Sequence, residues 1–105
     1  MTTKEFLLNL PTKINSKLLD GMTTCFHFDM EGEGGGQVSI LVENGVMNCM
    51  EGLIGSSKCT IRSTAEDLKK IFKGELNPLM AILTGKLKVS NQSEMIKFAK
   101  ILGWM

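Results

Sequence analysis

The residues of this chain that could carry out chemistry are few, and the most suggestive are two thiols and an imidazole. Cys25 and His27 stand two apart, a spacing that puts both side chains on one face of a strand. Cys49 could approach them from a neighbouring strand and complete a set of metal ligands. No Cys-x-x-Cys or His-x-x-x-His pair supports such a centre. We therefore expect a packed strand histidine, and neither a metal site nor a catalytic thiol.

A glycine-rich segment, residues 32–36, could cradle a phosphate, because glycine lets backbone N–H groups approach an anion closely. A phosphate loop leads into a helix and ends in Gly-Lys-Ser/Thr, whereas a strand pattern follows here and that ending is missing. The segment is therefore predicted to be a turn. Nearby acidic residues are expected at solvent-facing strand ends rather than as a catalytic pair: Asp29, Glu31, Glu33, Glu43 and Glu51. We expect no catalytic residue, no cofactor and no enzymatic activity.

Alternating apolar and polar residues predict the strands that position these groups. The expected strands are residues 23–30, 37–43, 46–51, 58–63 and 87–90. The sequence Asn44-Gly45 is a strong signal for a two-residue hairpin between the second and third of them. Helices are expected over residues 3–9, 63–74 and 93–102, with a turn or helix over 11–19. Helices and strands in this order predict an α+β fold, an antiparallel or mixed sheet with its helices on one face.

The segment 74–88 is the most informative, because it sets a short apolar helix between two glycines and leads directly into a strand. Asn77 can cap this helix, Pro78 fits its first turn, and Gly85 supplies the left-handed residue that ends it. Its large apolar side chains leave almost no polar face: Leu79, Met80, Ile82 and Leu83. We therefore expect this helix to be covered by protein or by an apolar ligand.

The C-terminal helix is also too apolar for a single core face. Its main stripe is formed by Met95, Phe98, Ala99 and Leu102. Ile96, Ile101 and Trp104 fall elsewhere around it, with Trp104 expected at a mobile end. Either a second protein surface covers the surplus, or one side faces a cavity and a ligand. Eight methionines add flexible thioethers that repack around irregular apolar contents, although ordinary core filling explains any one of them equally well.

Length and charge predict one domain, residues 1–105, and exclude several classes of function. By counting, residues 1–57 carry a net charge of −4 and residues 58–105 carry +5. The basic half favours an anionic partner, but few aromatics and the lack of an arginine cluster argue against nucleic acid. Three widely spaced cysteines suit reduced, buried thiols. With no apolar run near the ~20 residues of a membrane span, we expect a cytoplasmic protein.

Several segments together resemble the sterol carrier protein 2 type lipid-transfer domain. The resemblance covers nearly the whole chain and is carried by Phe26–Asp29 with Gly32, the Asn44-Gly45 hairpin, Cys59–Ile61, the helix 63–74 and above all Gly74–Val89. It implies a five-stranded, mostly antiparallel sheet with helices packed on one face and enclosing an apolar tunnel. The implied function is non-enzymatic binding and intracellular transfer of a fatty acid, acyl-CoA, phospholipid or sterol. Asn91 stands where the family often has glycine, and because asparagine tolerates a left-handed turn, the implied fold is compatible with this departure.

The expected sidedness of the strands and helices, combined with the tunnel that the resemblance implies, predicts the lipid-binding residues. They are Phe26, Phe28, Val38, Ile40, Val42, Ile61, Leu68, Phe72, Met80, Leu83, Met95, Phe98 and Leu102. Four lysines could hold the domain against an anionic membrane: Lys86, Lys88, Lys97 and Lys100. The alternative is a small protein-interaction or dimerisation module with a collapsed core, accessory to a lipid-metabolising enzyme. Either a monomer or a weak dimer is compatible with the sequence.

Overall fold

The computed structural model describes residues 1–104 of the chain. Its elements are α1 (Thr3–Leu8), the 3-10 helices η1 (Leu10–Thr12) and η2 (Ser16–Leu19), β1 (Thr24–Glu31), β2 (Gly36–Glu43), β3 (Val46–Glu51), β4 (Cys59–Thr64), α2 (Ala65–Phe72), α3 (Pro78–Leu83), β5 (Lys88–Val89) and α4 (Gln92–Leu102). All five expected strands and the principal helices are therefore present. The segment 11–19 forms two short 3-10 helices rather than one continuous helix.

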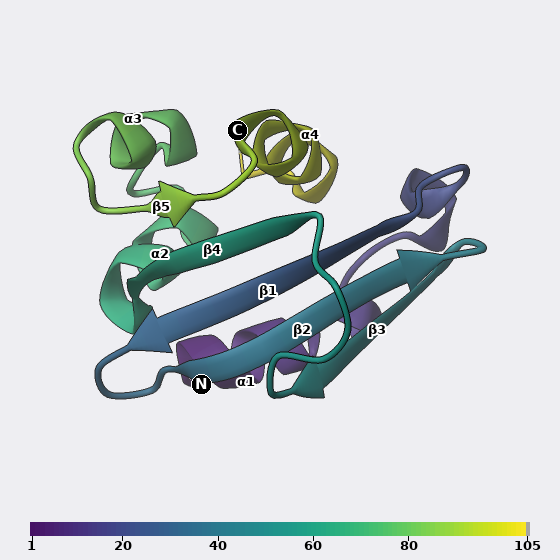
Figure 1. Cartoon of the computed structure of the whole chain (residues 1–105), viewed down its shortest axis with the longest axis horizontal. Coiled ribbons are helices and arrows are strands. Elements are labelled where there is room, and N and C mark those ends of the chain that lie inside the picture. Colours follow the sequence, from purple (N-terminus) through teal and green to yellow (C-terminus); the bar gives the residue numbers. More distant parts are fainter. Residues whose placement is uncertain (105) are drawn as a thin grey trace.

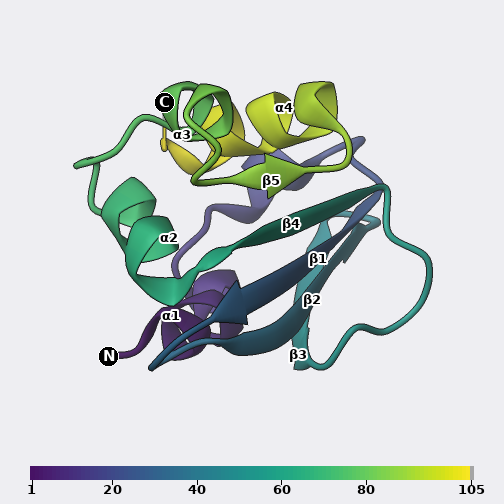
Figure 2. The same ribbon diagram turned by 60° about the vertical axis from the view of Figure 1, so that its left-hand side comes forward.

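The strands form one mixed five-stranded sheet in the order β3-β2-β1-β4-β5. β1 lies at the centre and pairs antiparallel with β2 and parallel with β4, while the outer pairs are antiparallel. Figures 1 and 2 show the helices gathered on one side of this sheet, with α1 behind β2 and with α3 and α4 at the end near β5. The α+β prediction is confirmed, including helices that cover a single face.

Turn chemistry sets the lengths of the hairpins. Asn44 and Gly45 both have positive φ, 52° and 74°, which is the backbone of the tight hairpin turn that matches strand twist. The glycine segment 32–36 closes the hairpin between β1 and β2, as predicted. At Gly35 a Cβ would lie 2.6 Å from the carbonyl oxygen of Met30, so the turn has no room for a side chain there.

Side-chain caps set where the helices begin. Thr64 accepts a hydrogen bond from the backbone N–H of Asp67, and Asn77 accepts two from the first turn of α3. Asn91 does the same for Glu94 at the start of α4. Asn91 does not need its tolerance of a left-handed turn, because its φ is −143° and it serves as an extended N-cap.

The segment from Gly52 to Lys58 crosses the uncovered face of the sheet, because β3 and β4 are separated by two strands. Ser39 holds it there: its hydroxyl donates to the carbonyl of Gly52 at 2.6 Å and accepts the N–H of Ile54 at 2.8 Å. His27 Nε2 lies 2.9 Å from the carbonyl oxygen of Ile54 and therefore carries the proton. His27 is thus a packed strand histidine, as expected, and its partner is the crossover.

We predict that Ser39→Ala destabilises the domain by about 1–3 kcal/mol, because it leaves the Ile54 N–H and the Gly52 carbonyl without their partner beside a fully buried position. Urea unfolding of wild type and variant measures the difference. Ser56→Ala, at an exposed position in the same crossover, is the matched control and is expected to stay within about 0.5 kcal/mol. Equal losses in the two variants would contradict this role for Ser39.

Candidate functional site

The inner face of the sheet is continuous and apolar. On β1, Phe26 lies opposite Ile40 of β2 and Phe28 lies opposite Val38, and β4 adds Ile61 beside Phe28. The helices supply the facing layer. Nine of the thirteen predicted lipid-binding residues meet here with no more than 1% of their surface exposed: Phe26, Phe28, Val38, Ile40, Val42, Ile61, Leu68, Met95 and Phe98. The structure therefore brings most of the predicted site together as one buried cluster.

The other four predicted residues lie further out. Phe72 and Leu102 are half-buried and pack against the edge of the cluster. Met80 and Leu83 are 53% and 71% exposed, so they do not line the interior. Pro78 and Ala81 are the residues of α3 that turn inward, one turn apart. Sequence alone did not separate the two sides of α3, because nearly every residue of that helix is apolar.

The aromatic rings form a single chain of contacts. Ring centroids are 4.5 Å apart for Phe6 and Phe72, 4.6 Å for Phe72 and Trp104, and 6.0 Å for Trp104 and Phe98. Phe98 stacks on Phe26 at 4.3 Å, and Phe26 lies 6.2 Å from Phe28. These are all the aromatic residues of the chain, five Phe and one Trp. Trp104 is therefore packed between two rings, which corrects the expectation that it lies at a mobile end of the chain.

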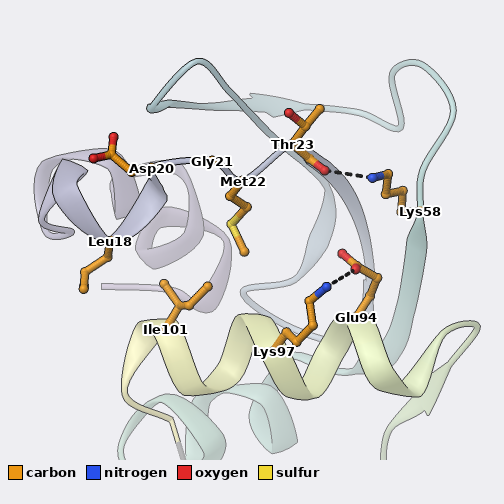
Figure 3. A pocket seen from close by; sticks show the side chains of 9 residues that line it. All are labelled: Leu18, Asp20, Gly21, Met22, Thr23, Lys58, Glu94, Lys97 and Ile101. Carbon is orange, nitrogen blue, oxygen red and sulfur yellow. Dashed lines mark hydrogen bonds and ion pairs between the residues drawn. The ribbon is translucent and has the colours of Figure 1, made fainter.

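The described surface has several hollows, and five of them are lined by none of the nine buried residues of the cluster. One, of about 380 Å³, lies between α1 and α2, with the half-buried Phe6 and Phe72 in its lining. Another, of about 440 Å³, lies between the turn before β1 and α4. In Figure 3 the apolar side chains of Leu18, Met22 and Ile101 lie towards the left of this second hollow, with Asp20 above Leu18, and Lys58, Glu94 and Lys97 lie towards the right. The nine residues of the cluster expose no more than 1% of their surface, so the interior is closed to solvent.

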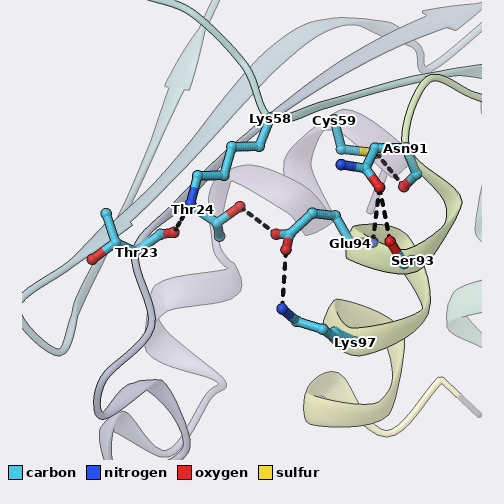
Figure 4. Close-up of polar contacts among 8 residues, drawn as sticks. All are labelled: Thr23, Thr24, Lys58, Cys59, Asn91, Ser93, Glu94 and Lys97. Carbon is cyan, nitrogen blue, oxygen red and sulfur yellow. Dashed lines mark hydrogen bonds and ion pairs between the residues drawn. The ribbon is translucent and has the colours of Figure 1, made fainter.

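A polar cluster fastens the start of α4 to the sheet (Figure 4). Glu94 accepts a hydrogen bond from the Thr24 hydroxyl at 2.9 Å and pairs with Lys97 at 3.1 Å. Partial burial by itself raises the pKa of Glu94, but the hydrogen bonds from Lys97 and Thr24 outweigh it and hold this pKa below its usual value. Nearby, Lys58 donates to the Thr23 carbonyl at 2.9 Å. We call Thr24, Glu94 and Lys97 the clasp.

The thiols do not converge. Cys25 shares the outer face with His27, but Cys49 pairs with Ile40 and so points to the inner face. Cys49 therefore does not approach Cys25 and His27 from the neighbouring strand, which was the arrangement that a metal site would have needed. Burial raises the pKa of Cys49 to about 12, and burial is also the main cause that raises the pKa of Cys25 and Cys59. Such thiols stay protonated at neutral pH. Within residues 1–104, no three His, Cys, Asp or Glu side chains gather as metal ligands would.

A mixed sheet with helices on one face and a largely apolar layer between them defines a two-layer α+β domain with a hydrophobic interior. The chain belongs to the SCP-2 sterol transfer family, whose model matches residues 4–102. Lipid binding and transfer is the general function of this family. No curated protein matches the chain in sequence. Among residues 1–104, no helix has both the length and the hydropathy that crossing a membrane would require.

Solved structures share the fold at low sequence identity. The palmitated SCP2L2 protein of Aedes aegypti has a TM-score of 0.75 and 18% identity over 97% of this chain and 95% of its own. The inverting sec-alkylsulfatase Pisa1 of Pseudomonas sp. has a TM-score of 0.82 and 19% identity over 100% of this chain. This chain spans only 16% of the length of that enzyme. A ubiquinone synthesis protein, UbiJ-SCP2, has a TM-score of 0.66 and 17% identity over 95% of this chain and 85% of its own.

We predict a pH-dependent contribution from the clasp. Because the pKa of Glu94 is lower in the folded state than in the unfolded state, its charge stabilises the fold above the ordinary carboxyl pKa, and this gain is lost as pH falls through the lowered value. Glu94→Gln should therefore lower the free energy of unfolding by no more than about 1 kcal/mol at neutral pH, and it should leave that free energy unchanged in strong acid. Denaturant unfolding across pH measures this. A cost that persists unchanged in strong acid would contradict it.

Proposed function

We propose that this chain binds one lipid molecule and carries it without chemically altering it. The observation that supports this most is the apolar layer itself, in which nine of the predicted lipid-binding residues form one cluster between sheet and helices. A fatty acid, an acyl-CoA or a phospholipid would place its acyl chain within this layer, and a sterol its ring system. Family membership supports the same class of ligand.

Binding of this kind needs apolar area more than placed polar groups. Each methylene removed from water contributes about 0.8 kcal/mol, so a long acyl chain gains far more than one hydrogen bond would supply. The interior is closed, and a ligand must therefore displace side chains as it enters. Three buried methionines, Met30, Met47 and Met95, are suited to repacking because their side chains are flexible and unbranched. The affinity is then the burial gain minus the cost of opening.

One observation favours the alternative function, a protein-interaction module with a collapsed core. The inner face is filled by its own side chains, and three of the exposed large apolar residues lie together on α3: Leu79, Met80 and Leu83. A partner protein, including a lipid-metabolising enzyme, could bind there without any interior ligand. Saturable binding of lipid to the folded domain separates the two proposals, because a collapsed core would show none.

We predict that the wild type binds fluorescent fatty acids or acyl-CoA with micromolar affinity or better. Ile82→Trp should weaken this binding roughly tenfold, because Ile82 packs against the core and overpacking costs about 1–3 kcal/mol. Leu83→Trp is the matched control on the same helix, and its 71% exposed side chain should leave the affinity unchanged. Native mass spectrometry of the freshly purified protein would identify a co-purified lipid. No saturable binding of acyl chains or of a sterol analogue would remove the carrier proposal.

We further propose that α3 contacts an anionic membrane during transfer. Its outer side presents exposed apolar groups, and Lys86 and Lys88 follow directly at exposed positions. Lys97, which the sequence placed in the same role, is paired with Glu94 and is less available. Apolar side chains flanked by lysines suit the boundary between anionic headgroups and acyl chains, where each lysine contributes about 1 kcal/mol.

Leu83→Ser is predicted to lower partitioning onto phosphatidylcholine vesicles that contain phosphatidylglycerol by roughly tenfold, since a leucine buried in the interface is worth about 1.5–3 kcal/mol. Vesicle co-sedimentation at low and high salt measures this, and Lys86→Glu/Lys88→Glu should abolish the salt dependence. Leu18→Ser, at a residue of η2 that is 50% exposed, is the control. Equal partitioning of the two serine variants would rule out α3 as the contact.

A further inference from the structure

The hollow between α1 and α2 combines an aromatic floor with a basic rim. Phe6 and Phe72 lie stacked in its lining and are only half-buried. Lys69 and Lys73 stand at its edge, four residues apart and hence on one side of the helix. Lys13 does not line the hollow, but its ammonium group lies 4.4 Å from the centre of the Phe6 ring and donates to the Met1 sulfur at 3.6 Å. A surface with this chemistry suits an amphiphile that has an anionic head.

The cations at this hollow are not already paired. Within residues 1–104 the ion pairs join Lys4 to Glu51, Lys70 to Glu66 and Lys97 to Glu94, and none involves Lys13, Lys69 or Lys73. Lys69 and Lys73 also lie at the C-terminal end of α2, where the negative end of the helix dipole favours a positive charge. The dipole accounts for a positive charge at that helix end. It does not account for an exposed aromatic floor beside that charge.

The hollow of Figure 3 also has lysines beside apolar side chains, but there they are engaged. Lys97 pairs with Glu94, and Lys58 donates to the Thr23 carbonyl. Asp20 adds a further negative charge to that lining. An anionic head would therefore have to displace existing partners there, and it would meet carboxylates. The hollow between α1 and α2 has no carboxylate in its own lining, although its Lys69 also lines an adjoining hollow that contains Glu5, Glu33 and Glu66.

The same hollow connects to the interior through the aromatic chain. Phe72 contacts Trp104, and Trp104 contacts Phe98, which is fully buried against Phe26. Trp104 lies just beyond α4, after the left-handed Gly103. Its backbone N–H donates to the Ala99 carbonyl at 2.8 Å, while its ring is held by contacts with other rings. The rings of Phe72, Trp104 and Phe98 thus form a continuous line of contacts from the hollow to the centre.

We propose that the hollow between α1 and α2 is the entrance of the lipid site. Lys69 and Lys73 hold the carboxylate or phosphate head of a single-chain amphiphile, and its tail takes the place of the Trp104 ring between Phe72 and Phe98. This inference rests on the proposed lipid-carrier function and adds to it the position and the charge of the ligand's head. Trp104 is the only tryptophan, so its emission reports directly on the step.

The experiment titrates the protein with tetradecanoate, tetradecyl phosphate and tetradecanol, each below its aggregation limit, and follows Trp104 emission. The anionic ligands should shift the emission to the red as the ring moves into water. Lys69→Glu/Lys73→Glu should weaken the binding of the anionic ligands about tenfold, and it should leave the affinity for tetradecanol within about twofold of the wild-type value. Comparing the carboxylate with the phosphate shows which head the lysines prefer. Lys17→Glu/Arg62→Glu, at two exposed positions away from this hollow, makes the same change in net charge and should alter neither affinity.

Each other outcome overturns a defined part of the proposal. If all three ligands bind wild type and Lys69→Glu/Lys73→Glu equally well, the entrance lies elsewhere and the carrier function stands. A loss seen with Lys58→Glu instead would move the entrance to the hollow of Figure 3. Charge-dependent binding without any change in Trp104 emission would remove the path past that ring. If none of the ligands binds, the carrier function fails too. Circular dichroism checks that each variant folds. If Lys69→Glu/Lys73→Glu unfolds, Lys69→Gln/Lys73→Gln replaces it, and the affinity of that variant for the anionic ligands is expected to be about threefold weaker than that of the wild type.

Discussion

The structure depends on the alignment of β1 between its two neighbours. This strand pairs with β2 on one side and with β4 on the other, and its side chains alternate between the two faces. A slip of one residue would turn Phe26 and Phe28 outward and bring His27 into the core. Two separate interactions prevent this: Phe98 stacks on Phe26 from the helical side, and the crossover binds His27 from the other. The inner face is apolar only because this alignment holds.

Much of the fold could be predicted because its signals are local. Alternation located the strands, Asn44-Gly45 fixed one hairpin, and capping residues such as Asn77 marked the starts of helices. The parallel pairing of β1 with β4 could not be predicted in the same way, since it depends on how the crossover runs over the sheet. The clasp was also missed. Thr24 and Glu94 lie 70 residues apart, and nothing in the spacing of either one indicates the other.

The candidate site shows the same division between local and distant information. The strand residues on the inner face followed from alternation, and those of α4 from its apolar stripe. α3 offered no such contrast, so Met80 and Leu83 were assigned to an interior that they do not reach. The aromatic chain escaped detection for another reason. Phe6, Phe72 and Trp104 come from three different elements, and only their packing in the fold brings the rings together.

The two ends of the helical layer are held by different kinds of interaction, and this difference bears on how a closed interior could take up a ligand. At its start α4 is tied to β1 by a hydrogen bond and an ion pair around Glu94. Beyond its other end, the ring of Trp104 is held by contacts with Phe72 and Phe98. An incoming acyl chain can replace apolar contacts of that second kind nearly one for one, whereas opening the clasp would expose a carboxylate and a hydroxyl that the chain cannot satisfy. The cost of opening is therefore lower at the Trp104 end. A slender, flexible chain needs a smaller displacement there than a rigid ring system, so the closed interior favours an acyl lipid over a sterol as the first ligand to test.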